Sequence, residues 1–483
     1  MPSDVCPPPA ELSTALCADP TEALVLSEFR RAAREVPAYG ILLEEHGVVA
    51  EAIHDLRSFS RHCPLLSRNN TFDRFSIDQL TAGGDLIDVA DVLTSSGHGG
   101  RFSFGVITRH QASLNAESID DALDDAFQVR TRKTLAINCL PMGVGFSSKI
   151  MTVATTSVRE DMAVALVETF GHRYEQILLV GDPLFMKRLT DHARARRLDW
   201  SRRRVSVVLG EEIFGERFRG YLSGCLAVDA SRPHDGYIMS SFGVGELGLH
   251  LCYETPATIG LRRASLDNPA FARDLLGVRD DDVLPMIFTY NPRRTFIEIL
   301  EAGARGYGRM TISMLDPDRA VPLLRYQTGD VARVLGPAHV EELMHRHGVV
   351  VPGELPQALL AFRGRQNEEL PNGSHVGFYK DALYADHRAA RLLTGAFRVA
   401  FAGDECTLHV QLAGSPVSLG TLQEDILRAM PPHVRPDRLV LWAYHEFPFG
   451  MGLDYERKFA YYSAAPSDAA RSPLASASPE CVL

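Results

Sequence analysis

Strand-like and helix-like segments alternate through the middle of this chain, and this alternation is the feature that most restricts its fold. Apolar, β-prone runs at 133–140, 176–180 and 205–209 are separated by helix-prone segments at 159–171 and 183–198. Strands that are joined through helices in this way usually pair in parallel, with the helices packed on the faces of the sheet. The alternation therefore predicts an α/β domain with a mostly parallel sheet.

Three loops follow the predicted strands of this domain, at 141–146, 181–183 and 210–212. Ligands of such sheets bind beyond the carboxyl ends of the strands. We therefore expect a substrate pocket near these loops, although its residues offer no readable charge partner that would identify the substrate. The candidate pocket residues are Met142, Gly143, Gly145, Phe146, Gly210 and Glu211.

A loop of small residues, Thr-Ser-Ser-Gly-His-Gly-Gly at 94–100, interrupts two β-prone runs upstream of this domain. The flanking runs predict a hairpin with this loop at its tip. Glycine N–H groups and the three hydroxyls could form a concave cradle for a polyphosphate. An ordinary glycine-rich turn is the better explanation of the loop when it is taken alone, because short motifs are weak evidence. Neither a Walker loop nor a dinucleotide-binding fingerprint is present.

With 483 residues, the chain is too long for one compact core, so a second domain is expected. Helix-prone and strand-prone segments between 381 and 444 predict that this domain is small and of the α+β class. Stretches rich in Pro, Ala and Ser at both ends are expected to be disordered. The expected parts are a disordered start at 1–20, a main domain at 21–362, a small domain at 363–463 and a disordered tail at 464–483.

The charge and composition exclude several classes of function. A net charge of −11 argues against a general nucleic-acid binder and against binding to an anionic membrane surface. No apolar run approaches the ~20 residues of a membrane span, and the first residues do not resemble a signal peptide. Eight scattered cysteines without metal-ligand spacing are typical of a cytoplasmic protein with reduced thiols. The oligomeric state is left open, with a homodimer as one option.

Four further motifs follow the small-residue loop in order: Ser-Phe-Gly-Val-Gly-Glu at 241–246, Arg-Tyr-Gln-Thr-Gly-Asp at 325–330, Gly-Arg at 364–365, and Lys458. Over residues 37–462, this order resembles the adenylate-forming ligase superfamily, and most closely the phenylacetate–CoA ligase group with its capsule-type relatives. The resemblance implies a large N-terminal domain of layered sheets and helices with a small α+β C-terminal lid domain. It also implies ATP and Mg²⁺ as cofactors, a small carboxylic acid as substrate, and coenzyme A as co-substrate.

The resemblance further implies a role for each matched residue. Asp330 would accept hydrogen bonds from both ribose hydroxyls, Glu246 would help to hold Mg²⁺, and Lys458 would bridge the carboxylate and the α-phosphate during adenylation. The other expected contacts are Thr94, Ser95, Ser96, Gly97, Gly99 and Gly100 at the pyrophosphate, Ser241, Phe242 and Gly243 at the adenine and acyl group, and Arg365 at the joint between the domains.

Each of these residues also has an ordinary structural explanation. Asp330 could stabilise its own turn, Glu246 could be a salt-bridging acid, and residues 241–243 could pack in the core. Gly-Arg at 364–365 is unremarkable by itself, and residues 456–458 could form a solvated charge cluster.

The loop at 94–100 departs from the pattern of the family. His98 and Gly99 stand where two hydroxyls are expected, and Phe102 and Ser103 replace a proline and a basic residue. Each lost donor would weaken the grip on phosphate by about 1 kcal/mol or more. A protonated His98, together with Arg101, could compensate beside a triphosphate, and His98 is therefore a catalytic candidate.

Three interpretations of the function stay open. The first is a ligase that adenylates a small, aromatic carboxylic acid and transfers it to coenzyme A. The second is an adenylating enzyme of specialised metabolism that transfers to an amine or a carrier protein, or that activates an unusual oxyanion. The third is a non-catalytic nucleotide-binding relative that has lost adenylation through the changes at 98–99.

Overall fold

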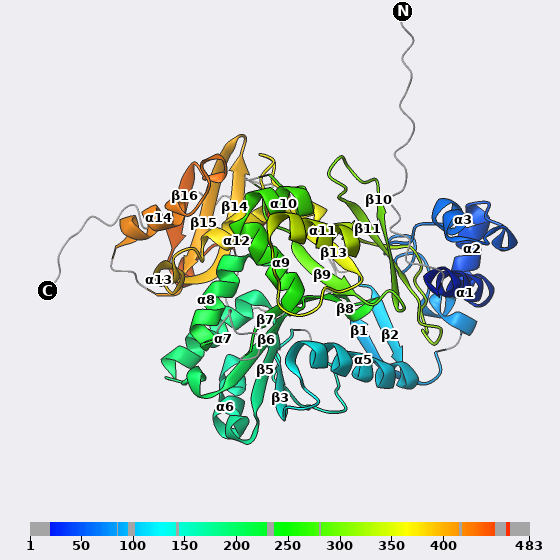
Figure 1. Cartoon of the computed structure of the whole chain (residues 1–483), viewed down its shortest axis with the longest axis horizontal. Coiled ribbons are helices and arrows are strands. Elements are labelled where there is room, and N and C mark those ends of the chain that lie inside the picture. The colour runs from blue at the N-terminus through cyan, green and yellow to red at the C-terminus, as the bar shows by residue number, and fades with distance from the viewer. Residues whose placement is uncertain are drawn as a thin grey trace, which may run out of the picture.

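The computed structural model has a large mixed sheet with helices packed around it and a smaller C-terminal part (Figure 1). A group of helices, α1 to α4, precedes the sheet and lies beside it. Their bounds are Pro20–Glu35, Pro37–Glu45, Leu56–His62 and Ile77–Leu80. The structure describes residues 20–84, 86–94, 102–141, 144–228, 236–279, 282–414, 418–449 and 460–463.

One half of the eleven-stranded sheet is parallel, in the order β7-β6-β5-β3-β4, and it confirms the predicted alternation. Strand β4 was not expected, because it has four residues and is half exposed. The bounds are β3 Thr134–Asn138, β4 Thr152–Thr155, β5 Gln176–Gly181, β6 Arg204–Leu209 and β7 Ile238–Val244, with α6 at Glu160–Phe170, α7 at Pro183–Ala195 and α8 at Glu216–Leu226.

The other half of the sheet is antiparallel, in the order β7-β8-β9-β13-β12-β11-β10, so the expectation of mostly parallel strands holds only for the first half. Short apolar runs do not reveal the direction in which a strand pairs. The bounds are β8 Gly248–Tyr253, β9 Met286–Tyr290, β10 Thr295–Leu300, β11 Gly308–Met314, β12 Tyr326–Leu335 and β13 Leu359–Arg365, with α9 at Pro256–Asp267, α10 at Pro269–Leu276 and α11 at Pro337–His347.

The predicted hairpin is present as an antiparallel pair of strands, β1 (Val89–Thr94) and β2 (Phe104–Thr108). The tip of the hairpin, at 95–101, lies outside the described residues. Helix α5 (Arg109–Phe127) follows directly. Acids at 117, 120, 121, 124 and 125 predict a solvated face on this helix. Asp120 is instead buried and accepts a hydrogen bond from the backbone N–H of Lys149 at 2.7 Å. That acid holds a distant loop, a contact that helical spacing does not show.

The C-terminal part contains a four-stranded sheet in the order β16-β15-β14-β17 (Figure 1). Strand β13 belongs to the large sheet as far as Arg365, so the chain leaves that sheet three residues after the expected boundary at 362. The bounds are β14 Leu393–Ala402, β15 Glu405–Leu412, β16 Arg438–Trp442 and β17 Tyr462–Ser463, with α12 at Val376–Ala382, α13 at His387–Ala390 and α14 at Leu419–Arg428.

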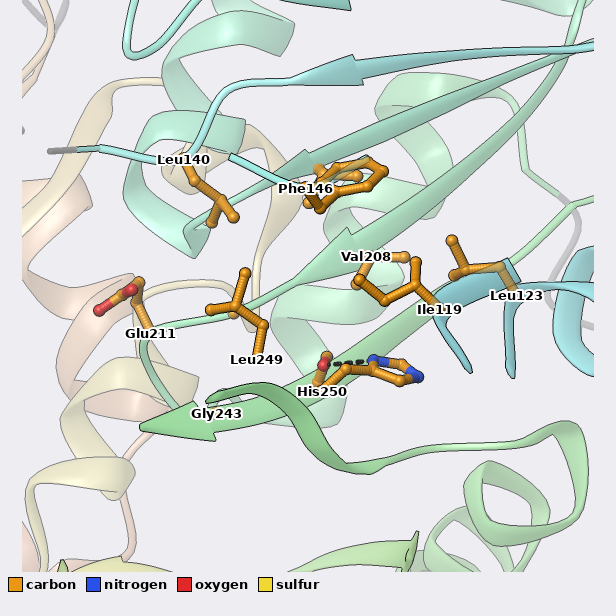
Figure 2. A pocket seen from close by; sticks show the side chains of 12 residues that line it. Ile119, Leu123, Leu140, Phe146, Val208, Glu211, Gly243, Leu249 and His250 are labelled. Carbon is orange, nitrogen blue, oxygen red and sulfur yellow. Dashed lines mark hydrogen bonds between the residues drawn. The ribbon is translucent and has the colours of Figure 1, made fainter. Parts of the chain in front are cut away.

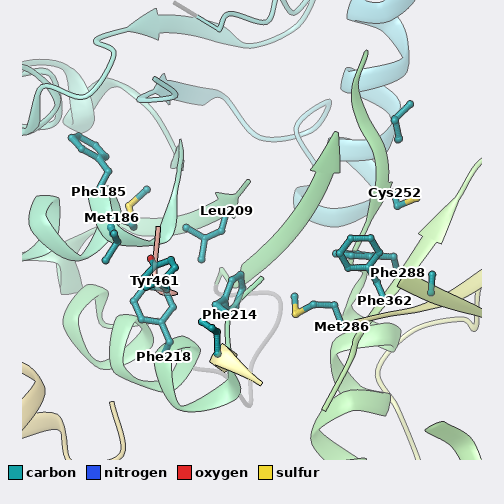
Figure 3. Close-up of a cluster of buried hydrophobic side chains, with 14 of the residues drawn as sticks. Phe185, Met186, Leu209, Phe214, Phe218, Cys252, Met286, Phe288, Phe362 and Tyr461 are labelled. Atoms are coloured by element: carbon teal, nitrogen blue, oxygen red, sulfur yellow. The ribbon is translucent and has the colours of Figure 1, made fainter. Parts of the chain in front are cut away.

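One hydrophobic core runs from the large sheet into the C-terminal part. Figure 3 shows Tyr461, from the end of the described chain, among Phe185, Met186 and Phe218 of α7 and α8. The two parts are therefore packed against each other through buried apolar side chains. Within the described ranges, no helix is both long enough and apolar enough to cross a membrane.

Candidate active site

An apolar pocket lies at the carboxyl ends of β5, β6 and β7, where the sequence predicts one (Figure 2). Its volume is about 660 Å³ when the space open to solvent at its mouth is counted. The described residues that line it are Ile119, Leu123, Leu140, Phe146, Val180, Val208, Gly210, Glu211, Ser241, Gly243, Leu249 and His250.

Three of the six predicted pocket residues, Phe146, Gly210 and Glu211, line this pocket. Gly145 is the chain neighbour of Phe146 and is not itself a lining residue. Glu211 has a φ of +69°, so the chain turns sharply where β6 ends. Met142 and Gly143 lie outside the described residues.

Asn138, at the end of β3, shapes the loop that carries Phe146. The side chain is fully buried, and its Nδ2 donates to the carbonyl of Val144 at 2.8 Å. Its Oδ1 accepts from the N–H of Leu140 at 3.2 Å. A buried amide that pairs on both sides fixes the path of the loop around it. The sequence analysis did not single out Asn138, although an asparagine in a buried strand is a usable signal.

The polar end of the pocket is formed by Ser241 and His250, which face each other from β7 and β8. Ser241 Oγ lies 2.8 Å from His250 Nδ1 (Figure 2). Burial, followed by the nearby charge of Arg294, lowers the pKa of His250 to about 4. The imidazole is therefore neutral at neutral pH. The sequence analysis missed His250, because a single histidine in a strand carries no motif.

Glu246 is buried beside the pocket strand β7. Its Oε1 accepts a hydrogen bond from Tyr326 Oη at 2.6 Å, and its Oε2 is buried with no partner among the described residues. The loop end of the β1–β2 hairpin touches the same segment, because a Cβ added at Gly105 would lie 2.1 Å from the carbonyl oxygen of Gly245. The structure therefore brings Glu246 next to the hairpin that carries the small-residue loop.

Asp330 and Arg365 are direct neighbours across β12 and β13. The sequence predicts a tight turn at 328–330, whereas the structure has a bulge inside one continuous strand: these three residues face Met310 alone. Gly329, with a φ of +82°, permits the bulge. The bulge places Asp330, which is 4% exposed, beside the end of β13.

Other predicted residues lie elsewhere. The ring of Phe242 packs against Phe362, with ring centroids 4.8 Å apart, and Phe242 is not among the residues that line the pocket. Thr94 is exposed at the end of β1. Ser95, Ser96, Gly97, His98, Gly99, Gly100 and Lys458 lie outside the described residues, so their roles stay predictions.

A half-buried cluster joins the C-terminal part to the rim of the pocket. Glu212, which follows the pocket residue Glu211, forms an ion pair with Lys380 at 2.9 Å and accepts a hydrogen bond from Tyr461 Oη at 2.9 Å. Lys380 also lies 3.6 Å from Glu368. Glu212 lies 168 positions from Lys380 and 249 positions from Tyr461, so no local sequence pattern predicts these contacts.

Tyr461→Phe should loosen this connection, because it removes one hydrogen bond to a charged carboxylate. We expect the free energy of local unfolding of the C-terminal part to fall by about 1.5 kcal/mol. Limited proteolysis of this part should therefore be faster. Tyr462→Phe is the matched control, since the Tyr462 ring packs against Phe401 instead. Equal proteolysis rates for the two variants would contradict a role for the Tyr461 hydroxyl.

Comparisons with known proteins bear on the fold. No protein-family model matches the chain, and no curated protein matches it. Among solved structures, the chain is similar to 2-hydroxyisobutyryl-CoA ligase in the postadenylation state, in complex with R3-HIB-AMP. The TM-score is 0.65, at 12% identity, over 92% of this chain and 88% of that chain. The chain has the adenylate-forming enzyme fold. This confirms the predicted fold class, including the smaller C-terminal domain.

Two further structures of the same ligase are in different states. The postadenylation state with 2-HIB-AMP gives a TM-score of 0.64, at 14% identity, over 92% of this chain and 88% of that chain. An open conformation with 2-HIB-AMP and CoA gives 0.52, at 13% identity, over 92% and 90%. The structure described here therefore superposes better on the postadenylation structures than on the open one.

Proposed function

We propose that this protein is an ATP-dependent, AMP-forming ligase that adenylates a small carboxylic acid and transfers the acyl group to coenzyme A. The observation that carries the proposal is the position of Glu246. It lies buried between the hairpin of the small-residue loop and the strand that lines the apolar pocket. The adenylate-forming enzyme fold supports the same conclusion, and at 12–14% identity it supports no finer one.

In the proposed reaction, a carboxylate oxygen of the acid attacks the α-phosphorus of ATP and pyrophosphate leaves. The thiol of coenzyme A then attacks the acyl carbon, and AMP leaves. Catalysis of such transfers is mostly positioning and charge stabilisation. Asp330 would hold the ribose and Arg365 would contact ribose or phosphate. The apolar pocket would hold the tail of the acid, and the predicted lysine, Lys458, would bridge the carboxylate and the α-phosphate.

Mg²⁺ is part of the proposal, and Glu246 fits the role of its protein ligand. Its unpartnered Oε2 is the kind of oxygen that Mg²⁺ binds, and nucleotide sites often supply only one or two carboxylates, with phosphates and water completing the shell. When bound, the ion would neutralise charge on the phosphates. Within the described ranges, no group of three His, Cys, Asp or Glu side chains could hold a metal unaided.

The finer parts of the proposal are an aromatic acid and a place near the phenylacetate–CoA ligase group. The ring of Phe146 and the surrounding aliphatic side chains support an aromatic or similarly apolar tail. The departures at His98 and Gly99 favour the second candidate, an adenylating enzyme that uses an amine or a carrier protein as acceptor. The same departures would also suit a relative that binds ATP without adenylation.

Pyrophosphate release separates these candidates. The protein is incubated with ATP, Mg²⁺ and a panel of carboxylic acids, and a reaction without acid gives the background. We expect acid-dependent release with at least one apolar acid, and a thioester mass when coenzyme A is added. Release without a thioester would favour the amine or carrier-protein acceptor. Bound ATP with no release for any acid would contradict adenylation altogether.

A further inference from the structure

A nitrogen of one histidine in the apolar pocket has no partner. His250 Nε2 is buried and makes no hydrogen bond with any described residue. Buried polar groups in folded proteins are almost always paired, and each exception calls for an explanation. His250 lines the pocket, and its Nε2 has almost no solvent-accessible surface while the pocket is empty. A bound molecule could therefore supply the missing partner once a neighbouring side chain in the pocket wall moves aside.

Two side-chain contacts and a strained backbone conformation fix the position of this ring. Ser241 Oγ holds Nδ1 at 2.8 Å, and the ring stacks on Tyr253, with centroids 4.4 Å apart and planes at 11°. The backbone of His250 has a φ of +59°, a left-handed conformation that costs free energy in a residue with a side chain. Such strained residues cluster at ligand sites, where the surrounding structure holds them in place. Nε2 is therefore held in one place before any ligand arrives.

The protonation state restricts what the missing partner can be. Burial keeps the pKa of His250 at about 4, so the ring is neutral and carries one N–H. If Ser241 donates to Nδ1, then Nε2 is the donor, and if Nδ1–H donates to Ser241, then Nε2 is the acceptor. A hydroxyl group both donates and accepts, so it satisfies either tautomer.

The other residues that line the pocket restrict the charge and polarity of the ligand's tail. No described lining residue is cationic, and the one acid, Glu211, lies at the side of the pocket away from Ile119 and Leu123 (Figure 2). A second carboxylate on the tail would thus contact no cationic side chain in the pocket wall, because the nearest charge that acts on His250, Arg294, is not a lining residue. The aliphatic side chains and Phe146 suit an apolar tail.

We infer that His250 determines specificity, and that the acid used by this protein carries a hydroxyl group on an otherwise apolar tail, bonded to His250 Nε2. The inference rests on the proposed function and names the substrate class of its pocket. A site that pairs a substrate hydroxyl discriminates against the analogue without it, because binding that analogue leaves a buried polar atom unpaired.

The test uses matched pairs of acids that differ only by a hydroxyl group. Suitable pairs are benzoate with its three monohydroxy isomers, phenylacetate with 4-hydroxyphenylacetate, and hexanoate with 6-hydroxyhexanoate. Acid-dependent pyrophosphate release gives kcat/KM for each acid. We expect at least one hydroxylated acid to exceed its partner by about tenfold or more. Equal values, or higher values for the unsubstituted acids throughout, would overturn the inference and leave the proposed function standing.

Variants of His250 then assign the preference to this residue. His250→Phe keeps an aromatic ring. In this variant, the ratio of kcat/KM for the hydroxylated acid to kcat/KM for its unsubstituted partner should fall to about one. His250→Asn is the second variant, because asparagine tolerates a positive φ and does not reach as far. The control is His409→Phe, which changes another buried histidine whose pKa is lowered to about 4, and it should keep the wild-type ratio.

Each outcome of the variants is decisive. A ratio that survives in both folded His250 variants would overturn the assignment to His250. A ratio lost only in these variants would support it. Absence of release from every acid, with ATP still bound, would instead overturn the proposed function, and this inference with it.

Discussion

Asp330→Ala should raise the dissociation constant for ATP on the order of a hundredfold. The carboxylate is expected to accept a hydrogen bond from each ribose hydroxyl, and a hydrogen bond to a charged group contributes about 1.5–3 kcal/mol. Two such bonds lost together give about 3 kcal/mol or more, at a factor of ten for each 1.4 kcal/mol. Titration calorimetry with ATP and Mg²⁺ measures the change directly.

Two controls make the Asp330 result specific. Asp330→Asn keeps the size of a buried side chain in the bulge of β12, so it should fold normally and lose part of the affinity. Asp274→Ala removes an acid that pairs with His347 at 2.7 Å on the surface of α10, and it should leave ATP binding unchanged. An Asp330→Ala protein that melts normally and binds ATP as tightly as wild type would remove Asp330 from the nucleotide site.

The order of elements could be predicted from the sequence because it depends on local patterns. Apolar runs of strand length alternate with helix-length amphipathic segments, and their spacing leaves few ways to build a sheet. The same rule placed the pocket, since Gly210 and Glu211 follow a buried strand and strand ends gather at one edge. The hairpin from Val89 to Thr108 was predictable because two β-prone runs flank a loop of small residues.

The rest of the site depends on contacts between residues far apart in the chain, and no local pattern encodes those. The pairing of Glu212 with Lys380 spans 168 residues, and Tyr326 reaches Glu246 across 80. His250 depends on a left-handed φ that is visible only in three dimensions. Thr-Gly-Asp at 328–330 suits a turn and a bulge equally well, and only the strands on both sides decide between them.

A buried ion-pair network holds the strand that forms the polar end of the pocket. Arg219 and Glu254, 1% and 0% exposed, are joined by two contacts of 2.8 and 3.0 Å. Glu254 also accepts a hydrogen bond from the N–H of Ser240 at 2.7 Å.

Glu216 belongs to the same network, because it also pairs with Arg219. Burial raises the pKa of Glu216, but the charges of Arg219, Arg262 and Arg263 outweigh this effect and lower the pKa to about 2. Glu216 therefore stabilises the fold above about pH 4.5, and this contribution is lost as the pH falls toward 2.

Glu254→Ala should destabilise the protein by about 3–5 kcal/mol, because it leaves a buried guanidinium partly uncompensated and an N–H of β7 unpaired. Thermal unfolding should show a midpoint lower by about 3–5 °C, because the unfolding entropy of a chain this long is large. Glu301→Ala is the matched control: its pair with Arg309 is exposed and should contribute about 1 kcal/mol or less. Pyrophosphate release at a temperature where Glu254→Ala is still folded should also fall, since Ser240 precedes Ser241 in the pocket. Destabilisation with full activity at that temperature would mean that the network supports the fold without positioning the pocket.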